Sequence, residues 1–337
     1  MIIVLKPNLS SKEQSAVVKE IKRLGYRPHV MRGVARTVIG AIGDETAHQS
    51  LDVLRAWPQV ESVTPIQKRF KLVSREAHPQ NSTVKARNVV IGARPLVVMA
   101  GPCSVESEKQ LMETAHAVKA AGAQILRGGA FKPRTSPYEF QGLGEKGLKL
   151  LAKARKETGL PIITELLSQD HAEMVAEYAD ILQIGARNAQ NFQLLIAAAK
   201  TGKPVLLKRG LSMKIEEWLL AGEYVLSNDN PNLLFCERGI RTFETYTRNT
   251  LDLSAVPIIK QESHCPVVID PSQGAGRADL VVAMCKGAVA MGADALLIEV
   301  HPNPKEAWSD GAQQLTLDGF SKLMTELKPF IAAAGRE

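Results

Sequence analysis

The chain has 337 residues, 45% of them hydrophobic, and a formal net charge of +7. This length allows one domain of roughly 250 residues and a small additional one. No apolar run reaches the roughly 20 residues of a membrane span, and residues 1 to 6 lack the basic start and long apolar core of a signal peptide, so we expect a cytoplasmic protein. The basic residues are scattered and no basic helix carries stacking aromatics, which argues against nucleic acid and favours anionic small molecules as partners.

Residues 1 to 67 predict a small α+β domain of the ferredoxin-like type, with the order strand, helix, strand, strand, helix, strand. Ser10 and Glu13 form a capping box before the first helix, and the second helix is expected from about Asp44 to Trp57, stopped by Pro58. The strands are expected at Met1 to Lys6, Arg27 to Arg32, Arg36 to Ile42 and Val60 to Ile66. No cluster of residues suited to catalysis is present, which favours a role in sensing or assembly.

The remainder predicts a polar linker at 68–83 and a large α/β domain at 84–337. Short apolar strands recur there, each followed by a helical segment. They are expected at Pro95 to Ala100, Gln124 to Gly128, Pro161 to Glu165, Ile181 to Gly185, Pro204 to Lys208, Leu233 to Glu237, Pro266 to Asp270 and Ala295 to Val300. Strands that are apolar throughout indicate a parallel sheet buried on both faces. Eight repeats over roughly 250 residues, with no GxGxxG, favour a (β/α)8 TIM barrel over an open Rossmann sheet.

Basic side chains follow most of these strands. A single Arg or Lys at a strand end is more often an ordinary exposed loop residue, but their recurrence makes coincidence improbable. Because a barrel carries its active site at the carboxyl ends of the strands, they are expected to meet at one mouth. Arginine forms paired hydrogen bonds with phosphate and carboxylate groups, so the expected ligand carries several negative charges. The cations are Arg127, Lys132, Arg134, Arg187, Lys208, Arg209 and Arg238.

Cys103 and Glu299 lie at the same mouth. A thiolate and a carboxylate together suit a divalent transition metal that acts as a Lewis acid. The chain has no CxxC pair, which argues against a disulfide framework or a zinc ribbon. A buried cysteine is ordinarily a small hydrophobe, and this is the expectation for Cys236, Cys265 and Cys285. The position of Cys103 after Gly101-Pro102 favours a metal ligand.

Several strings at these strand ends resemble 3-deoxy-D-arabino-heptulosonate 7-phosphate (DAHP) synthase of the short type, which has an N-terminal ferredoxin-like regulatory domain. They are AGPCSVES at 100–107, RGGAFKPRTSPYEFQG at 127–142, IGARN at 184–188, LLKRG at 206–210, CERGIRTFE at 236–244 and IEVHP at 298–302. The resemblance covers essentially the whole chain. The related synthase that uses arabinose 5-phosphate has an asparagine-containing string in place of the KPRT at 132–135.

The resemblance implies a transferase that condenses phosphoenolpyruvate with erythrose 4-phosphate and water, giving DAHP and phosphate, at the start of the shikimate pathway and aromatic amino-acid biosynthesis. The metal polarises the aldehyde while C3 of phosphoenolpyruvate attacks it; water adds at C2 and phosphate leaves that carbon. Arg134 and Thr135 would hold the phosphate of erythrose 4-phosphate. The residues implied for phosphoenolpyruvate are Arg127, Lys132, Arg187, Lys208 and Arg238.

Two side chains are candidates for proton transfer in this reaction, Lys132 and Glu165. For Glu165, a structural ion pair with one of the mouth arginines is an equally open alternative. A cationic mouth serves such a reaction by holding two anions within bonding distance and by stabilising charge in the transition state.

The implied metal ligands depart from the family at one position. The family uses Cys, His, Glu and Asp, which correspond to Cys103, position 273, Glu299 and Asp310, and position 273 is Gln273 here. An amide oxygen binds cations but is a neutral, harder donor than imidazole, so we expect weaker affinity or a changed preference among Mn²⁺, Fe²⁺, Co²⁺ and Zn²⁺. His301 is an alternative ligand two residues after Glu299, although the family string also carries it, which favours a structural role.

Two further hypotheses stay open. One is a relative that acts on another aldose phosphate, such as arabinose 5-phosphate, or works without a tightly bound metal. The other is a catalytically silent binding or regulatory protein. The family associates the first domain with feedback inhibition by tyrosine or phenylalanine, and an assembly module without ligand is equally compatible with its sequence. The family also implies a homotetramer.

Overall fold

The computed structural model describes residues 1–32, 36–43, 48–64 and 69–337. The chain divides into two compact units, Met1–Arg69 and Phe70–Glu337. Within the described ranges, none of the helices combines the length and the apolar character needed to cross a bilayer.

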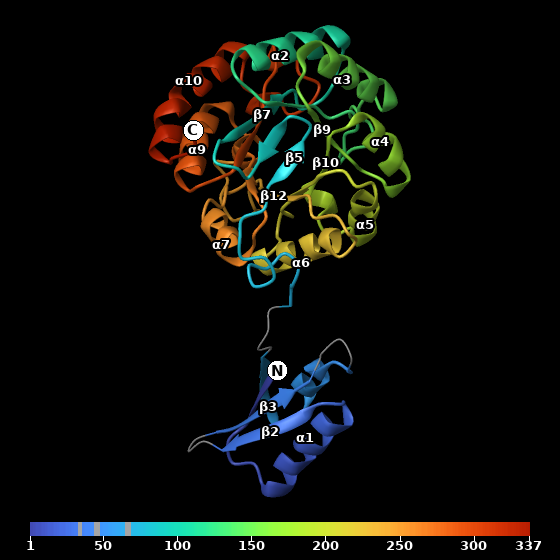
Figure 1. Ribbon diagram of the computed structural model, residues 1–337, viewed down its shortest axis with the longest axis vertical. Helices are drawn as coiled ribbons and strands as arrows, with labels where there is room; N and C mark the ends of the chain where they lie inside the picture. The colour runs from blue at the N-terminus through green and yellow to red at the C-terminus, as the bar shows by residue number, and fades with distance from the viewer. Residues whose placement is uncertain (33–35, 44–47, 65–68) are drawn as a thin grey trace. The chain divides into compact units, whose positions relative to one another are not determined.

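The first unit is a four-stranded antiparallel sheet with strand order β2-β3-β1-β4 and helix α1 against it (Figure 1). The strands are β1 (Ile2–Leu5), β2 (Arg27–Arg32), β3 (Thr37–Ile42) and β4 (Val60–Thr64), and the helix is α1 (Ser11–Arg23). The predicted capping box is confirmed: Glu13 N–H donates to Ser10 Oγ, and Ser10 N–H donates to Glu13 Oε2. Ile3, Val17, Ile21 and Ile39 form the centre of a separate apolar core.

The second helix of this unit is shorter than predicted. The sequence suggested an α-helix from about Asp44 to Trp57, but the structure has a 3₁₀ helix, η1 (Leu51–Ala56), and residues 44–47 lie outside the described residues. Ser50 Oγ accepts from Asp52 N–H at its start, and Trp57 is already extended before Pro58. Side chains three positions apart lie on the same side of a 3₁₀ helix. Leu51 and Leu54 have this spacing and are both fully buried, so this short helix is long enough to bury its two apolar side chains.

The second unit is a closed barrel of eight parallel strands in the order β10-β11-β12-β13-β14-β7-β8-β9. Every predicted strand is present, and no end differs from its prediction by more than two residues. The strands are β7 (Val97–Gly101), β8 (Ile125–Arg127), β9 (Ile162–Glu165), β10 (Ile181–Ile184), β11 (Val205–Lys208), β12 (Leu233–Glu237), β13 (Val267–Ile269) and β14 (Ala295–Glu299). The predicted TIM barrel is confirmed.

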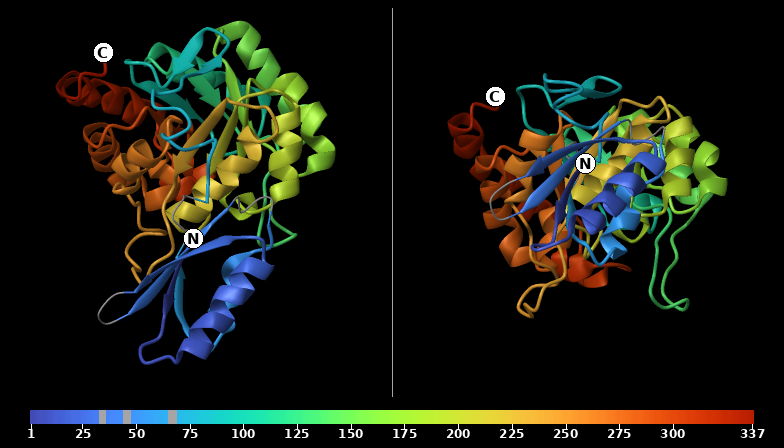
Figure 2. Two further views of the ribbon diagram at one scale, coloured as in Figure 1. Left: turned by 60° about the horizontal axis from the view of Figure 1, so that its bottom comes forward. Right: turned by 90° about the horizontal axis from the view of Figure 1, so that it is seen from below.

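Helices form a ring around the barrel strands in Figure 1, and they flank the strands on both sides in Figure 2. They are α2 (Glu108–Ala120), α3 (Glu145–Thr158), α4 (Ala172–Tyr178), α5 (Phe192–Lys200), α6 (Ile215–Leu226), α7 (Ala255–Glu262), α9 (Ala278–Ala290) and α10 (Leu317–Ala333). The short α8 (Pro271–Ala275) follows β13 directly, with Asp270 as its N-cap. Each parallel strand thus reaches its neighbour through a helical connection.

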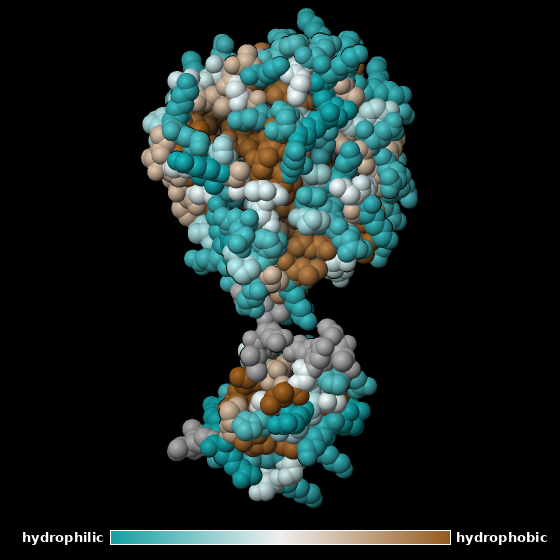
Figure 3. All heavy atoms as spheres, viewed as in Figure 1, coloured by the Kyte–Doolittle hydropathy of each residue, from teal (hydrophilic) through white to brown (hydrophobic). Residues whose placement is uncertain are grey.

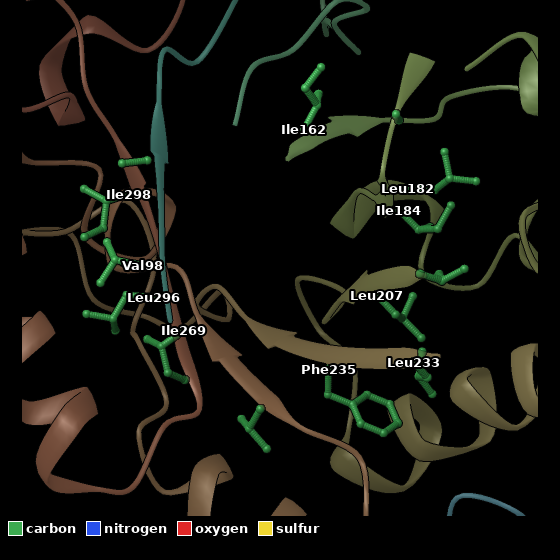
Figure 4. Packing of buried hydrophobic residues seen from close by; sticks show 14 of the residues in the cluster. Val98, Ile162, Leu182, Ile184, Leu207, Leu233, Phe235, Ile269, Leu296 and Ile298 are labelled. Atoms are coloured by element: carbon green, nitrogen blue, oxygen red, sulfur yellow. The ribbon is translucent and has the colours of Figure 1, made fainter. Parts of the chain in front are cut away.

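The strands present their side chains alternately to the helices and to the barrel interior. The outward side chains pack against the helices in one core, which includes Val98, Leu182, Leu207, Phe235 and Ile298 (Figure 4). The inward side chains form a second cluster, which includes Met99, Ile125, Leu206, Leu234 and Leu297. Both faces of the sheet are buried, as the continuous apolar runs predicted.

A hairpin that the sequence did not reveal closes one end of the interior. Its strands, β5 (Val84–Ala86) and β6 (Val89–Ile91), are antiparallel, and Val84 and Ile91 belong to the inward apolar cluster. Arg87 in its turn pairs with Asp180, which directly precedes β10, so the hairpin covers the amino-terminal ends of the strands. Figure 3, in the view of Figure 1, shows brown apolar surface near the centre of this unit.

The segment predicted as an exposed linker is docked on the barrel from Phe70 onward. Phe70 and Val73 are buried in the outer core of the barrel unit. Glu223 on α6 accepts hydrogen bonds from the backbone N–H groups of residues 71, 72 and 73, at 3.0, 2.7 and 3.1 Å. The polar composition of residues 68–83 concealed this attachment, to which two buried apolar side chains and one distant carboxylate contribute.

Candidate active site

A layer of charged side chains lies inside the barrel next to the apolar layer. On several strands an apolar inward residue is followed two positions later by a charged one, and both therefore point inward. The pairs are Ile125 and Arg127, Ile163 and Glu165, Leu206 and Lys208, Val268 and Asp270, and Leu297 and Glu299. The alternation that buries apolar residues at one end thus places ions at the carboxyl ends of the strands.

A cavity of about 320 Å³ opens at this end of the barrel. All the cations implied for the two substrates line it together with Thr135, whereas Arg209 does not. Among the described lining residues, the eight basic ones are Arg127, Lys132, Arg134, Arg187, Lys208, Arg238, Arg241 and Arg248, against three carboxylates, Glu139, Glu165 and Asp310. This excess of positive charge suits a ligand with several anionic groups.

One predicted cation, Arg209, does not line the cavity, and two cations that line it were not predicted from the sequence. Arg209 pairs with Glu237 at 3.0 Å and with Asp252 at 2.7 Å, so it serves as a buried structural ion. Arg241 and Arg248 line the cavity instead. Arg241 stands in the same string as Arg238, which was a usable signal. Arg248 is brought back to the mouth by pairing of residues 240 and 250, and nothing in the local sequence marks it.

Glu165 lies at the end of β9 with its carboxylate buried among the cations. The glycine at position 185 makes room for it, because a Cβ atom there would overlap Glu165 Oε1. Burial raises the pKa of Glu165, and the nearby charges of Lys132 and Lys208 oppose this shift. Glu165 forms no direct ion pair with any residue that the structure describes. The structural ion-pair alternative therefore gains no support from the structure.

Lys132 connects the cavity to Cys103. Its Nζ donates to the Cys103 carbonyl oxygen and lies 3.0 Å from both this oxygen and Cys103 Sγ. Burial, with the Glu299 charge, raises the pKa of the Cys103 thiol to about 11. Cys103 Sγ donates in turn to Asp310 Oδ2 at 3.5 Å. The thiol is thus held between a cation and a carboxylate.

Cys103, Glu299 and Asp310 form a candidate metal site, since their ligand atoms lie within 4.8 Å of one another. Glu299 accepts from Arg127 Nη1 at 3.0 Å, and Asp310 accepts from Arg248 Nη1 at 3.1 Å. Burial acts against ionisation of Asp310, but Arg248 and Lys132 outweigh it and lower the pKa of Asp310 to about 2. One sulfur and two carboxylates suit a borderline divalent cation. The residues present therefore fit the metal that the resemblance implies.

Gln273 lies beside this cluster, as expected of the fourth position. Its Oε1 accepts from Arg238 Nη2 at 2.9 Å, and its Nε2 lies 3.1 Å from Glu299 Oε1 and 3.2 Å from Asp310 Oδ2. The hypothesis that Gln273 binds the metal stays a prediction.

His301 is directed elsewhere. Its Nε2 lies 3.2 Å from Glu106 Oε2, and its Nδ1 accepts from Asn303 N–H. Glu106 also accepts from Trp308 N–H, so this network fixes the loop that leads to Asp310. Since both ring nitrogens of His301 are occupied, the structure favours the structural role over the ligand role.

The mouth of the barrel combines surplus cations with a thiol and two carboxylates, which is the lining expected of a binding site for multiply charged anions with a candidate metal site beside it. The comparisons identify the family: the chain belongs to the DAHP synthetase I family, which matches residues 73–333, and residues 1–68 match the DAHP synthase ferredoxin-like domain. Both the predicted family and the two predicted folds are confirmed.

Similar proteins agree with this assignment. Phospho-2-dehydro-3-deoxyheptonate aldolase of Thermotoga maritima is 50% identical over 99% of both chains. The crystal structure of this DAHP synthase superimposes with a TM-score of 0.95, at 49% identity over 100% of this chain and 98% of that one. A truncated form of the enzyme gives a TM-score of 0.75, at 50% identity over 80% of this chain and 98% of that one. The 2-dehydro-3-deoxyphosphooctonate aldolase of Syntrophotalea carbinolica is 34% identical over 73% of this chain and 94% of that one.

Proposed function

We propose that the chain is a cytoplasmic transferase, a 3-deoxy-7-phosphoheptulonate synthase, which condenses phosphoenolpyruvate with erythrose 4-phosphate and water to give DAHP and phosphate in the shikimate pathway. The observation that carries the proposal is the cavity lined by eight basic residues beside the Cys103, Glu299 and Asp310 cluster. Both substrates carry a phosphate and one also carries a carboxylate, so fixed cations offset the repulsion between them.

Phosphoenolpyruvate binds at the inner part of the cavity in this proposal. Arg127 and Lys132 face its carboxylate, and Arg187 and Lys208 face its phosphate, with Arg238 nearby. The Nε of Arg127 supports this assignment, because it is buried and has no hydrogen-bond partner among the described residues. A buried donor without an acceptor is costly, and an anionic oxygen would satisfy it.

Erythrose 4-phosphate binds nearer the rim, where Arg134 and Thr135 hold its phosphate. Arg134 forms an ion pair with the exposed Glu139 at 2.6 Å. An exposed pair of this kind contributes little to stability, so a phosphate can replace the carboxylate at small cost. This arrangement leaves the aldehyde end of the sugar pointing toward the inner part of the cavity.

The reaction forms one carbon–carbon bond and breaks one carbon–oxygen bond. C3 of phosphoenolpyruvate bonds to the aldehyde carbon, water adds at C2, and phosphate leaves C2. A divalent cation, held by Cys103, Glu299 and Asp310, supplies Lewis-acid polarisation of the aldehyde when bound. The new alkoxide needs a proton and the added water must lose one. Lys132 is the proposed donor, and Glu165, with its raised pKa, is the proposed acceptor.

The first unit is proposed as a regulatory domain that binds tyrosine or phenylalanine, in a homotetramer. Its support is the match of residues 1–68 to the ferredoxin-like domain of DAHP synthases. Inhibition by either amino acid in the full chain, lost in a chain that begins at residue 70, is the expected result. Equal inhibition of both chains would exclude this unit as the sensor.

The test of the reaction is phosphate release from phosphoenolpyruvate with erythrose 4-phosphate, using chelator-stripped protein that is then titrated with Mn²⁺, Fe²⁺, Co²⁺ or Zn²⁺. We expect turnover restored by metal, and at least about tenfold slower turnover with arabinose 5-phosphate. Faster turnover with arabinose 5-phosphate would favour the other synthase. Substrate binding without phosphate release in every metal would favour the catalytically silent protein.

A further inference from the structure

The amide group of Gln273 makes hydrogen bonds at both ends. Its oxygen accepts from Arg238 Nη2 at 2.9 Å, and its nitrogen lies 3.1 and 3.2 Å from carboxylate oxygens of Glu299 and Asp310. This side chain therefore connects a cation of the anion cavity to two members of the candidate metal site.

The backbone of Gln273 is also fixed. Its N–H donates to Asp270 Oδ1 at 2.9 Å, and its carbonyl oxygen accepts from Asn249 Nδ2 at 3.0 Å. Asp270 forms an ion pair with Lys208 at 2.6 Å. The amide thus extends from the short helix α8, whose backbone is held at Gln273 by these two hydrogen bonds.

Only one orientation of this amide allows hydrogen bonds at both its oxygen and its nitrogen. If the group turned by 180°, its nitrogen would face the guanidinium of Arg238, which has donors only. Its oxygen would then face the carboxylates of Glu299 and Asp310, which accept. Three hydrogen bonds would be replaced by three repulsive contacts. The amide nitrogen is therefore held toward the candidate metal site, and the oxygen is held away from it.

This orientation matters because an amide nitrogen is a hydrogen-bond donor and amides bind cations through oxygen. To become a ligand, Gln273 would have to turn and lose its bonds to Arg238, Glu299 and Asp310 at once. Cys103, Glu299 and Asp310 need no such rearrangement, since their ligand atoms already lie within 4.8 Å of one another.

We propose that Gln273 is a positioning residue and not a metal ligand: its nitrogen holds the carboxylates of Glu299 and Asp310 side by side, and its oxygen fixes Arg238 at the anion cavity. The cation site and the anion site are thereby linked through one amide. The presence of a cation rests on the proposed function, and the role of Gln273 goes beyond it.

Arg238 gives this link a measurable consequence. Apart from Gln273, its only other hydrogen-bond acceptor among the described residues is the Gly239 carbonyl oxygen, at 3.4 Å. Removing the amide therefore leaves the guanidinium less fixed, and anions bind less tightly even in metal-free protein.

The experiment compares the full chain with the variants Gln273→Leu, which keeps the approximate size without the amide, and Gln273→His, which offers a ring nitrogen. Co²⁺ serves as the metal probe, read by its visible d–d bands and its thiolate-to-cobalt charge-transfer band. Inorganic phosphate is the anion probe, titrated calorimetrically into chelator-stripped protein. Neither readout requires turnover, so a failed condensation assay leaves this comparison intact.

For Gln273→Leu we expect unchanged d–d band positions, although Co²⁺ affinity falls on the order of tenfold because the carboxylates are less well held. Phosphate should bind the metal-free variant roughly three- to tenfold more weakly, as expected when one hydrogen bond that fixes a binding residue is lost. Gln273→His should shift the d–d bands, because the ring nitrogen enters the coordination sphere. If Gln273→Leu does not fold, Gln273→Ala gives the same readouts.

Two results would overturn the proposal. A d–d shift in Gln273→Leu would show that the amide is a ligand. Unchanged phosphate affinity in that variant would show that Arg238 does not depend on the amide.

Discussion

The two ends of the barrel interior are built from the same strands but have opposite character. At the amino-terminal end, Ile125 and Leu206 pack with the hairpin residue Ile91 in an apolar cluster. Two positions further along the same strands, Arg127 and Lys208 line the anion cavity. A displacement of two residues along a strand therefore separates the part of the interior that stabilises the barrel from the part that binds ligand.

Two of the buried cations at the charged end have a buried carboxylate as partner. Lys208 pairs with Asp270 at 2.6 Å, and Arg127 pairs with Glu299 at 3.0 Å. A buried ion without a partner would be strongly destabilising, whereas a well-paired one is close to neutral. The apolar end needs no such compensation. Substitutions at the two ends should therefore affect different quantities, activity at one end and stability at the other.

The largest effect is expected for Lys132→Met at the charged end. The substitution removes the ammonium that lies 3.0 Å from Cys103 Sγ and lines the cavity. We expect kcat/KM to fall by about 10²- to 10³-fold, as for removal of a single group that stabilises developing charge. Phosphoenolpyruvate consumption measures this. Lys149→Met, on the exposed face of α3, is the matched control and should leave kcat/KM unchanged.

The corresponding test at the apolar end is Ile91→Ala. Ile91 is fully buried in the inward cluster, so its truncation should lower the free energy of unfolding of the barrel by about 2–5 kcal/mol. In molecules that remain folded, kcat/KM should change less than about twofold. Urea denaturation followed by fluorescence gives the stability, with the more exposed neighbour Val90→Ala as control. A large loss of activity at unchanged stability would show that the two ends are not independent.

Two cysteines allow a direct comparison of the apolar end and the charged end, because both are fully buried and one lies at each end. Cys236 belongs to the apolar inward cluster, and Cys103 lies beside Glu299 and Asp310. Cys236→Ala should cost about 1 kcal/mol of stability and leave the thiolate-to-cobalt band intact. Cys103→Ala should abolish that band. Loss of the band in the Cys236 variant would contradict the assignment of the ligand.

The barrel was predictable because its signals are local. Each strand is a short apolar run. A residue at the carboxyl end of a barrel strand lies at the mouth of the barrel, independently of the conformation of the loops. This is why Arg127, Lys208 and Glu299 were found together from the sequence. The capping box at Ser10 and Glu13 was equally local.

The features that were missed depend on distant parts of the chain. The β5–β6 hairpin is short and interrupted by charged residues, and it becomes recognisable only once the barrel end that it covers exists. Arg248 reaches the cavity only because its loop returns through the pairing of residues 240 and 250. Arg209 carried the right charge at the right strand end, but the carboxylates of Glu237 and Asp252 hold it away from the cavity.

The smallest effect is expected for Glu165→Gln, which tests how the negative charge of Glu165 in the cavity changes the affinity for phosphoenolpyruvate. The amide keeps the shape of the side chain and removes a negative charge that lies near Lys132, Lys208 and the other cations. At a pH where Glu165 is ionised, phosphoenolpyruvate should therefore bind roughly three- to tenfold more tightly to the variant, as expected when a like charge is removed from a binding site. At the same time kcat should fall, because the proposed proton acceptor is lost. Calorimetry and steady-state kinetics separate the two effects.

The difference in affinity between the unmodified chain and Glu165→Gln should also depend on pH. The pKa of Glu165 is raised above its ordinary value of 4.5, mainly by burial, so the carboxyl group becomes neutral as pH falls toward that raised pKa. The unmodified chain then resembles the variant, and its affinity for phosphoenolpyruvate should approach that of Glu165→Gln at low pH and fall below it as pH rises. Comparing two proteins cancels the ionisation of the ligand itself, and Glu145→Gln on the exposed face of α3 controls for net charge. Weaker binding by Glu165→Gln at every pH would mean that Glu165 orients the neighbouring cations, and that its charge supports ligand binding at the mouth.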